Sequence, residues 1–324
     1  MEKKDGGAEA PVPGVASAAG LTAGIVSTLV THPLDLIKTR LQVNQRVAKG
    51  STKPPPPLTT MDVVRSLWKS KNPVTAAYRG LPVSLVANSA GWACFFHFKT
   101  VFENAITTQK YGLTSGDKPS PTGYFVASGL AGIATSCITN PLWLLRVRIT
   151  SLDRSVAEAY PSMRAGVKSI IQTETWKGFY KGLGTSLIGT SHGAIQFSLY
   201  EPLRNGYFAL RRRQGQEAGE KISNGATIAI STASKITAVV ATFPQQVVRN
   251  RLQNSYGKND YGKGITGVVQ QMWQEGGIRP FYRGIVPGVL RTLPATWVTF
   301  MVVEYVRFHL PLWLKGTDGG VSGE

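Results

Sequence analysis

Long uncharged stretches alternate along the chain with segments rich in lysine and arginine. Four stretches contain no Asp, Glu, Lys or Arg, and two more contain a single cation, Lys235 or Arg291. A helix needs about 20 residues to cross the hydrocarbon core of a bilayer, and these stretches have 19 to 27 residues each. They predict an all-α membrane protein with six spanning helices, at 10–34, 80–98, 119–145, 182–200, 222–248 and 284–303.

The six stretches are rich in Gly, Ala, Ser and Thr and only weakly apolar. Helices that face lipid on one side and a polar cavity on the other have this composition, whereas helices that face only lipid are more apolar. Small residues also recur at four-residue spacing, which allows helices to pack closely. The pattern favours a bundle around a polar cavity and leaves a soluble helical bundle as the alternative.

Three copies of two short motifs divide the chain into repeats. The prolines of HPLDLIKTRLQ, NPLWLLRVRIT and FPQQVVRNRLQ are spaced 108 and 103 residues apart, and the last glycines of AYRG, FYKG and FYRG are spaced 102 and 102 apart. A period near 100 is too long for a solenoid and indicates three copies of a small unit. We predict a single domain with repeats over 11–108, 119–210 and 222–313.

The net charge of +18 is distributed unevenly along the chain. This distribution decides between a membrane protein and a nucleic-acid-binding protein. The segments 36–79, 146–181 and 249–283, which join odd to even spans, contain 22 of the 36 Lys and Arg but only 6 of the 18 Asp and Glu. Such a bias places the basic segments on one side of a membrane, against anionic lipid. No second basic surface is left for nucleic acid, so we exclude a nucleic-acid-binding function.

The repeated motif Pro-x-acid-x-x-base, followed by aromatic-base-Gly, resembles the mitochondrial carrier family over nearly the whole chain. The resemblance implies a monomer with six transmembrane helices in three pseudo-threefold repeats, and alternating access across the mitochondrial inner membrane, with the peroxisomal membrane as the alternative. It also implies short matrix-side helices near 60–70, 162–173 and 264–274. Cardiolipin is expected at the motifs that end at Gly80, Gly182 and Gly284.

Details of the motifs indicate a branch of the family. Trp143 stands where the second motif normally has its acid, as in carriers of flavin, folate, NAD and pyrimidine nucleotides. The segments 189–201, 243–253 and 291–304 are most similar to the folate and FAD carriers. The resemblance implies that FAD or a folate is the transported cargo and not a bound cofactor. An NAD or pyrimidine nucleotide carrier is the alternative, as is a channel or uncoupler on the same scaffold.

The resemblance also assigns the odd helices to a matrix gate, in which the acid of one helix pairs with the base of the next. Proline inside a helix kinks its axis, so Pro33, Pro141 and Pro244 are expected to make the helix ends converge. The implied contacts are Asp35 with Arg146, Trp143 with Arg249, and Gln246 with Lys38, braced by Gln42 and Gln253 and more weakly by Thr150.

A second gate, on the cytoplasmic side, is implied for the even helices by the pattern aromatic-acid-x-x-base. Repeats two and three supply its acid and base, whereas repeat one lacks the acid, so this gate is expected to be incomplete. Its implied residues are Glu201, Arg204, Glu304 and Arg307, with Glu201 and Arg307 as the best pair.

Lys235 and Arg291 interrupt otherwise uncharged spans, and a cation at mid-membrane costs about 2.5–3.5 kcal/mol on insertion scales. Binding an anionic substrate accounts for this cost, with snorkelling or pairing between helices as the alternative. By resemblance, Arg291 lies at the substrate contact position of the sixth helix, and Gly189 is expected to leave room for a planar ring. The other predicted substrate contacts are Ile188, Ser191, His192, Ala87 and Asn88.

One motif suggests catalysis and is weighed against its context. GTSHG at 189–193 fits the G-x-S-x-G element of hydrolases, which requires a strand-to-helix turn and a separate histidine and acid. Here it lies inside a predicted membrane helix without alternating strands around it. Cys94 and Cys137 are isolated and do not form a metal-binding pattern. We therefore predict neither an enzyme nor a metal site.

Overall fold

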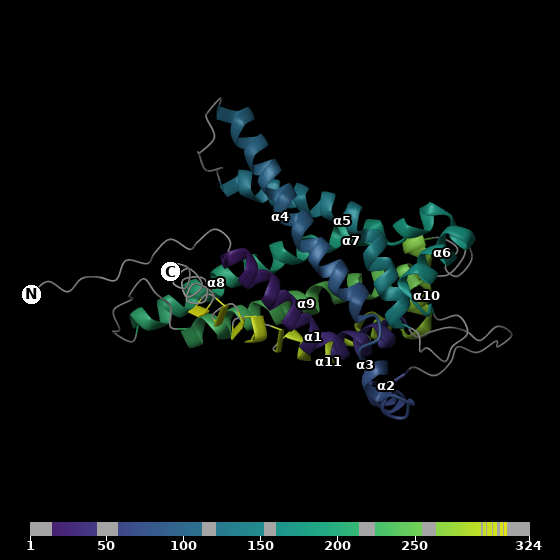
Figure 1. Cartoon of the computed structure of the whole chain (residues 1–324). Helices are drawn as coiled ribbons and strands as arrows, with labels where there is room; N and C mark the ends of the chain where they lie inside the picture. Colours follow the sequence, from purple (N-terminus) through teal and green to yellow (C-terminus); the bar gives the residue numbers. More distant parts are fainter. Residues whose placement is uncertain are drawn as a thin grey trace, which may run out of the picture. The chain divides into compact units, whose positions relative to one another are not determined.

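Helices account for every regular element in the part of the chain that the structure describes. The computed structural model describes residues 15–43, 58–111, 121–151, 160–213, 224–254 and 264–292, and then 294–295, 297–299, 301–302, 305–306 and 308–309. The elements are α1 (Val15–Val43), α2 (Thr60–Trp68), α3 (Pro73–Ala77), α4 (Leu81–Tyr111), α5 (Pro121–Ser151), α6 (Met163–Glu174), η1 (Trp176–Tyr180), α7 (Leu183–Gly189), α8 (Ser191–Arg213), α9 (Asn224–Asn254), α10 (Gly264–Gly276), η2 (Arg279–Tyr282) and α11 (Ile285–Leu290). Figure 1 labels the α-helices among them. The predicted all-α fold is confirmed.

The long helices α1, α5 and α9 share one register around their prolines. Pro33, Pro141 and Pro244 all lie inside a helix, and each is followed by ten more helical residues. The short helices α2, α6 and α10 begin within one residue of their predicted starts at 60, 162 and 264. The three repeats therefore build the same pair of elements, a long helix with an internal proline and then a short helix.

The starts of two short helices are explained by local capping. Thr59 Oγ1 accepts a hydrogen bond from the backbone N–H of Asp62 at 3.2 Å, and the Asp62 carboxylate accepts one from the Thr59 N–H at 2.9 Å. This capping box satisfies two backbone donors that would otherwise face water. In α6, Ser162 Oγ accepts from the Ala165 N–H at 3.2 Å and serves the same purpose.

Each short helix packs one apolar face on the long helix of its own repeat. The buried positions lie four residues apart, one helical turn, so they share a face. These positions are Val63 and Leu67 in α2, Gly166 and Ile170 in α6, and Val268 and Met272 in α10. All of them except Gly166 belong to three separate apolar clusters, each containing leucine, isoleucine, valine or phenylalanine side chains from the preceding long helix.

Replacing Ile170 by alanine is expected to lower the stability of the folded protein by about 2–5 kcal/mol, because a fully buried side chain would leave a cavity. Ile170 has 0% of its surface exposed, whereas its neighbour Ile171 is 54% exposed. Ile171→Ala is therefore the matched control and should cost much less. Thermal unfolding in detergent measures both variants, and equal losses would contradict the packing of α6 described above.

The fourth predicted span is divided, which the charge-free pattern did not predict. It forms α7 and α8, with Thr190 between them. The Thr190 hydroxyl donates to the Leu187 carbonyl at 2.7 Å, and Gly189 and Gly193 flank the break. Threonine side chains that bond to the backbone compete with the helix ladder, and glycine weakens a helix. Together these residues interrupt the helix at a predicted substrate position.

The described residues group into two compact units. One contains those up to Thr31 and from Pro294 onward, and the other contains His32–Leu293. In the second unit, α4 lies beside α5, and α8 lies beside α9 (Figure 1). Within the described residues, two helices are long and apolar enough to cross a membrane, Thr122–Ser151 and Gly225–Asn254. They correspond to the third and fifth of the six predicted spans.

Candidate functional site

Asp35 of α1 is bonded to two arginines that come from different parts of the chain. Arg146 of α5 places Nη2 at 3.1 Å from Asp35 Oδ2. Arg291, which follows α11, places Nη1 at 2.9 Å from Oδ1 and 3.0 Å from Oδ2. The predicted contact between Asp35 and Arg146 is therefore present, and Arg291 adds a second ion pair that the sequence did not predict.

Trp143 lies next to two cations of the same site. The Arg249 guanidinium is 5.6 Å from the centre of its ring, as expected from the predicted contact. The Arg146 guanidinium is 4.9 Å from it as well. Each cation over an indole face contributes about 0.5–2 kcal/mol, depending on how dry the site is. The indole thus attracts two guanidinium groups that would repel each other.

Lys38 makes the third predicted contact. Its Nζ donates to Gln246 Oε1 at 2.8 Å and lies 5.3 Å from the centre of the Phe243 ring. The Gln246 amide nitrogen donates in turn to Thr242 Oγ1 at 3.2 Å. Gln246 is therefore held in place on α9 while it accepts from Lys38. We call Asp35, Lys38, Trp143, Arg146, Gln246, Arg249 and Arg291 the gate cluster.

The predicted bracing residues divide into two that bridge helices and one that does not. Gln42 Oε1 accepts a hydrogen bond from Asn250 Nδ2 of α9, so it links α1 to α9. Gln253 Nε2 donates to Asn140 Oδ1 at 3.4 Å and links α9 to α5. The Thr150 hydroxyl instead donates to the Arg146 carbonyl of its own helix at 2.8 Å. Within the part of the chain that the structure describes, Thr150 makes no bracing hydrogen bond to another helix.

Two buried ion pairs next to the gate cluster were not predicted. Arg148, with 0% of its side chain exposed, bonds to Glu174 at 2.9 Å. Arg251, with 1% exposed, bonds to Glu275 at 2.9 Å. The signal was present in the sequence, because both arginines, and Arg40 in α1, lie seven residues beyond the repeated prolines. These pairs attach the C-terminal ends of α6 and α10 to α5 and α9.

Removing one partner of such a pair is expected to be costly. Burial disfavours ionisation of the Glu174 carboxyl, but hydrogen bonds from Arg148 and Lys181 outweigh this and lower the pKa of Glu174. Glu174→Gln should cost about 3–5 kcal/mol, since it leaves a buried guanidinium without its counter-charge. A lowered pKa in the folded state means that this stabilisation is complete at neutral pH and is lost as pH falls through that pKa.

The control for Glu174→Gln is Glu103→Gln in α4. Glu103 pairs with Lys99 one turn away at 2.7 Å, and the two side chains are 18% and 32% exposed. Pairs at this spacing contribute about 0.2–0.5 kcal/mol. Melting temperatures measured at neutral and acidic pH separate the variants, and a Glu174→Gln variant as stable as the control would refute a structural role for the buried pair.

Two predicted substrate positions have close neighbours in the structure. Arg291 is bonded to Asp35, which is the pairing with another helix that the sequence left as the alternative to an anion contact. At Gly189 we expected room for a planar ring, but an added side chain there would meet the Gln245 amide at 2.9 Å. Gln245 fills that space because its amide also donates to the Thr185 carbonyl of α7.

The remaining predicted contacts occupy different environments. Ala87 of α4 is fully buried, Ile188 of α7 is 59% exposed, and Asn88 is half-buried. His192 Nδ1 lies 2.9 Å from Thr242 Oγ1, so this histidine packs toward α9, the helix that carries Lys235. The Ser191 side chain lies outside the described residues.

Comparison with known proteins decides the family. The sequence profile described as mitochondrial carrier protein matches residues 11–110, 117–209 and 220–312. This chain belongs to the mitochondrial carrier family. Three relatives, each 31% identical to it, cover nearly all of this chain. The mitochondrial FAD carrier protein FLX1 of Saccharomyces cerevisiae matches over 90% of this chain and 95% of the relative. Folate transporter 1, chloroplastic, of Arabidopsis thaliana matches over 89% of this chain and 92% of the relative, and nicotinamide adenine dinucleotide transporter 1, chloroplastic, of the same plant matches over 91% of this chain and 93% of the relative.

The carrier's predicted cytoplasmic gate is described only in part. Glu201 Oε2 lies 3.9 Å from Arg204 Nη1 on α8, and both side chains are exposed. Glu304 and Arg307 lie outside the described residues, so their predicted contact with α8 stays a prediction. What the structure describes of this gate is one exposed ion pair within a single helix.

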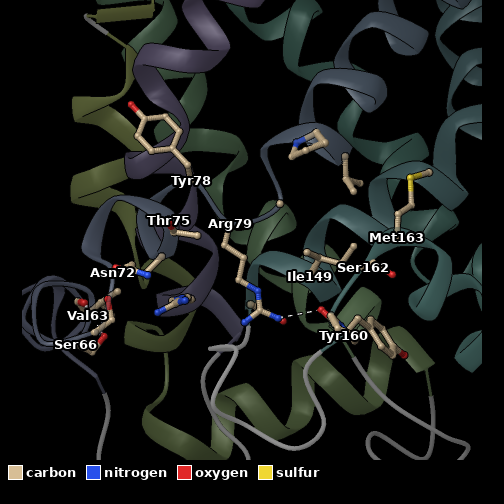
Figure 2. A pocket seen from close by; sticks show the side chains of 18 of the residues that line it. Val63, Ser66, Asn72, Thr75, Tyr78, Arg79, Ile149, Tyr160, Ser162 and Met163 are labelled. Carbon is tan, nitrogen blue, oxygen red and sulfur yellow. Dashed lines mark hydrogen bonds between the residues drawn. The ribbon is translucent and has the colours of Figure 1, made fainter.

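The carrier also has a cavity of about 1150 Å³ that does not include the gate cluster. Figure 2 shows Arg79 at its centre, where the guanidinium donates to the Tyr160 carbonyl at 3.1 Å. The lining comes from the end of α1, from α2 and α3, from the start of α4, the end of α5 and the start of α6, and from residues between these helices. Its charged lining residues are Arg40, Lys69, Lys71 and Arg79, all of them cations, and Gly80 lies beside them.

Proposed function

We propose that this carrier moves an anionic, nucleotide-like or folate-like metabolite, FAD or a folate first, across the mitochondrial inner membrane by alternating access. The observation that carries the proposal is the gate cluster, which contains four cations and one carboxylate, and α9 carries a further cation, Lys235. An excess of cations in a membrane protein is costly and favours an anion in the transport path. The FAD and folate carriers among the relatives support this substrate class.

NAD is the second candidate substrate. The Arabidopsis nicotinamide adenine dinucleotide transporter is as similar to this chain as the FAD and folate carriers are. NAD carries two phosphates and a planar base, so it offers the gate cluster and Lys235 the same chemistry as FAD. Identity near 31% over almost the full length therefore leaves the choice to experiment.

Transport into liposomes tests the proposal. Purified carrier is reconstituted, and uptake of labelled FAD, a reduced folate, NAD and UTP is compared at equal concentration, with empty liposomes as the control. Preferred uptake of FAD or a folate supports the assignment, whereas preferred uptake of NAD or UTP moves the carrier to the neighbouring branch. Saturable exchange supports a carrier cycle, and an uncoupled ionic current would instead indicate a channel or uncoupler.

We further propose that cardiolipin binds as a lipid partner at the glycine motifs, at Gly80 first. The support is the cavity in Figure 2, whose charged lining is basic and which includes Gly80. Lipid phosphates bind guanidinium and ammonium groups by charge-assisted hydrogen bonds. Gly182 and Gly284 have the same left-handed backbone as Gly80, with φ of 76°, 80° and 77° respectively, and we assign them the same role. A monomer is the expected unit of function.

A further inference from the structure

Asp35 is the point at which the predicted gate and the predicted substrate site meet. Its carboxylate accepts from Arg146, a gate residue, and from Arg291, a predicted substrate contact. The other two predicted acid positions of this gate hold Trp143 and Gln246, which have no negative charge. In the described residues of the gate cluster, Asp35 is therefore the single carboxylate for four cationic side chains.

The three ion-paired side chains differ in their access to solvent. The Asp35 and Arg146 side chains are 10% and 14% exposed, whereas the Arg291 side chain is 39% exposed. Arg291 is therefore the most accessible of the three groups to a dissolved anion. The guanidinium of Arg291 is also a planar fork that suits either a carboxylate or a phosphate.

We propose that Arg291 is a gate residue as well as a substrate contact, and that the anionic substrate weakens the gate by competing with Asp35 for Arg291. The competition rests on the proposed function, because it requires an anionic substrate. A guanidinium that is already bonded to Asp35 binds a second anion less well than a guanidinium without such a bond. Substrate binding thereby removes one of the two ion pairs that hold Asp35, and only the pair with Arg146 remains to be broken.

Substrate affinity in five variants, three single and two double, tests the competition. Asp35→Asn removes the competing charge, and we expect the Kd for the transported anion to fall about tenfold. The same substitution in an Arg291→Gln background should leave the Kd unchanged, because no competition is left to relieve. In a Lys235→Gln background it should again lower the Kd about tenfold, since the ion pairs that Asp35 makes are with Arg146 and Arg291.

The backgrounds distinguish competition from a general electrostatic effect. An equal gain in affinity in all three backgrounds would show that Asp35 only lowers the potential of the site, and would overturn the proposal. No gain in any background would overturn it too. FAD, a reduced folate, NAD and UTP are the ligands used, and binding is measured by the rise in melting temperature, which follows mass action.

A second measurement needs no substrate and therefore separates this proposal from the proposed function. If none of the four anions binds, the proposed function fails, but the ion pair can still be tested by a double-mutant cycle on the melting temperature. The losses from Asp35→Asn and Arg291→Gln should be non-additive, and those from Asp35→Asn and Lys235→Gln should be additive. Additive losses in both cycles would overturn the role of Arg291 in the gate.

Arg291→Lys provides a further variant for the case in which Asp35→Asn does not purify. It keeps the charge but loses the two-pronged contact with Asp35, so the melting temperature of the substrate-free carrier should fall. Lys235→Arg is the matched control and should leave it unchanged. An Arg291→Lys carrier that melts like the wild type would refute the proposal.

Discussion

Exchanging Asp35 for arginine is expected to abolish most transport and to favour the state in which the gate cluster is open. The substitution replaces the single carboxylate of the gate cluster by a third guanidinium beside Arg146 and Arg291. Two attractions become repulsions, and like charges in a partly dry site cost several kcal/mol. Because a carrier must populate both of its states, locking one of them stops the cycle. Uptake into liposomes and the labelling of single cysteines from each side measure the two effects.

Combining Asp35→Arg with Arg146→Asp should restore part of the activity. The exchange re-forms the pair between α1 and α5 in reversed order, whereas Arg291 then faces an arginine where it had a carboxylate. Recovery is therefore expected to be incomplete, and adding Arg291→Gln should improve it. Double-mutant cycles on the transport rates isolate the coupling of Asp35 with Arg146 and that of Asp35 with Arg291. If the double variant is no more active than the sum of the single effects allows, Asp35 and Arg146 are not functional partners.

The second large effect is expected from Lys235→Gln. This lysine lies on α9, eleven residues before the gate residue Gln246, so both lie on one side of the helix. Losing a charge-assisted contact to a bound anion costs about 1.5–3 kcal/mol, which corresponds to about ten- to a hundredfold weaker binding. KM should rise by this factor, and the melting temperature without substrate reports separately on any change in stability. Lys99→Gln, the same change on α4, is the matched control.

Equal transport by Lys235→Gln and the wild type would remove Lys235 from the substrate site. A loss of transport shared by Lys99→Gln would show that the number of cations in the long helices matters more than the position of Lys235. The comparison is direct because both variants replace lysine by glutamine within a long helix. It also separates binding from folding, since unfolding is followed in the same preparations.

The parts of this fold that sequence predicts well are those that repeat. The prolines of α1, α5 and α9 lie at one register, so an acid or base at a fixed distance from each proline must occupy an equivalent place. The repeated motifs also carry the resemblance to the family, and that resemblance implied the contacts of Asp35 with Arg146 and of Lys38 with Gln246, which the structure contains. It likewise implied where α2, α6 and α10 begin.

The features that were not predicted depend on long side chains reaching out of register. Arg291 has no equivalent cation in the other repeats, so nothing in the repeat indicated that its guanidinium would reach Asp35. Gln245 covers Gly189 because its flexible amide finds the Thr185 carbonyl, which no sequence spacing specifies. Sequence alone located these residues on their helices, but the choice among several reachable partners is made by packing.

The position of Trp143 between two arginines has a consequence for energy coupling. An indole and a carboxamide neither gain nor lose a proton in the physiological range. Among the three predicted acid positions of this gate, Asp35 is therefore the one that can take up a proton, whereas Trp143 and Gln246 cannot. A proton on Asp35 would weaken the ion pairs with both Arg146 and Arg291 at once, so proton coupling through the acid positions has to act on that single carboxylate.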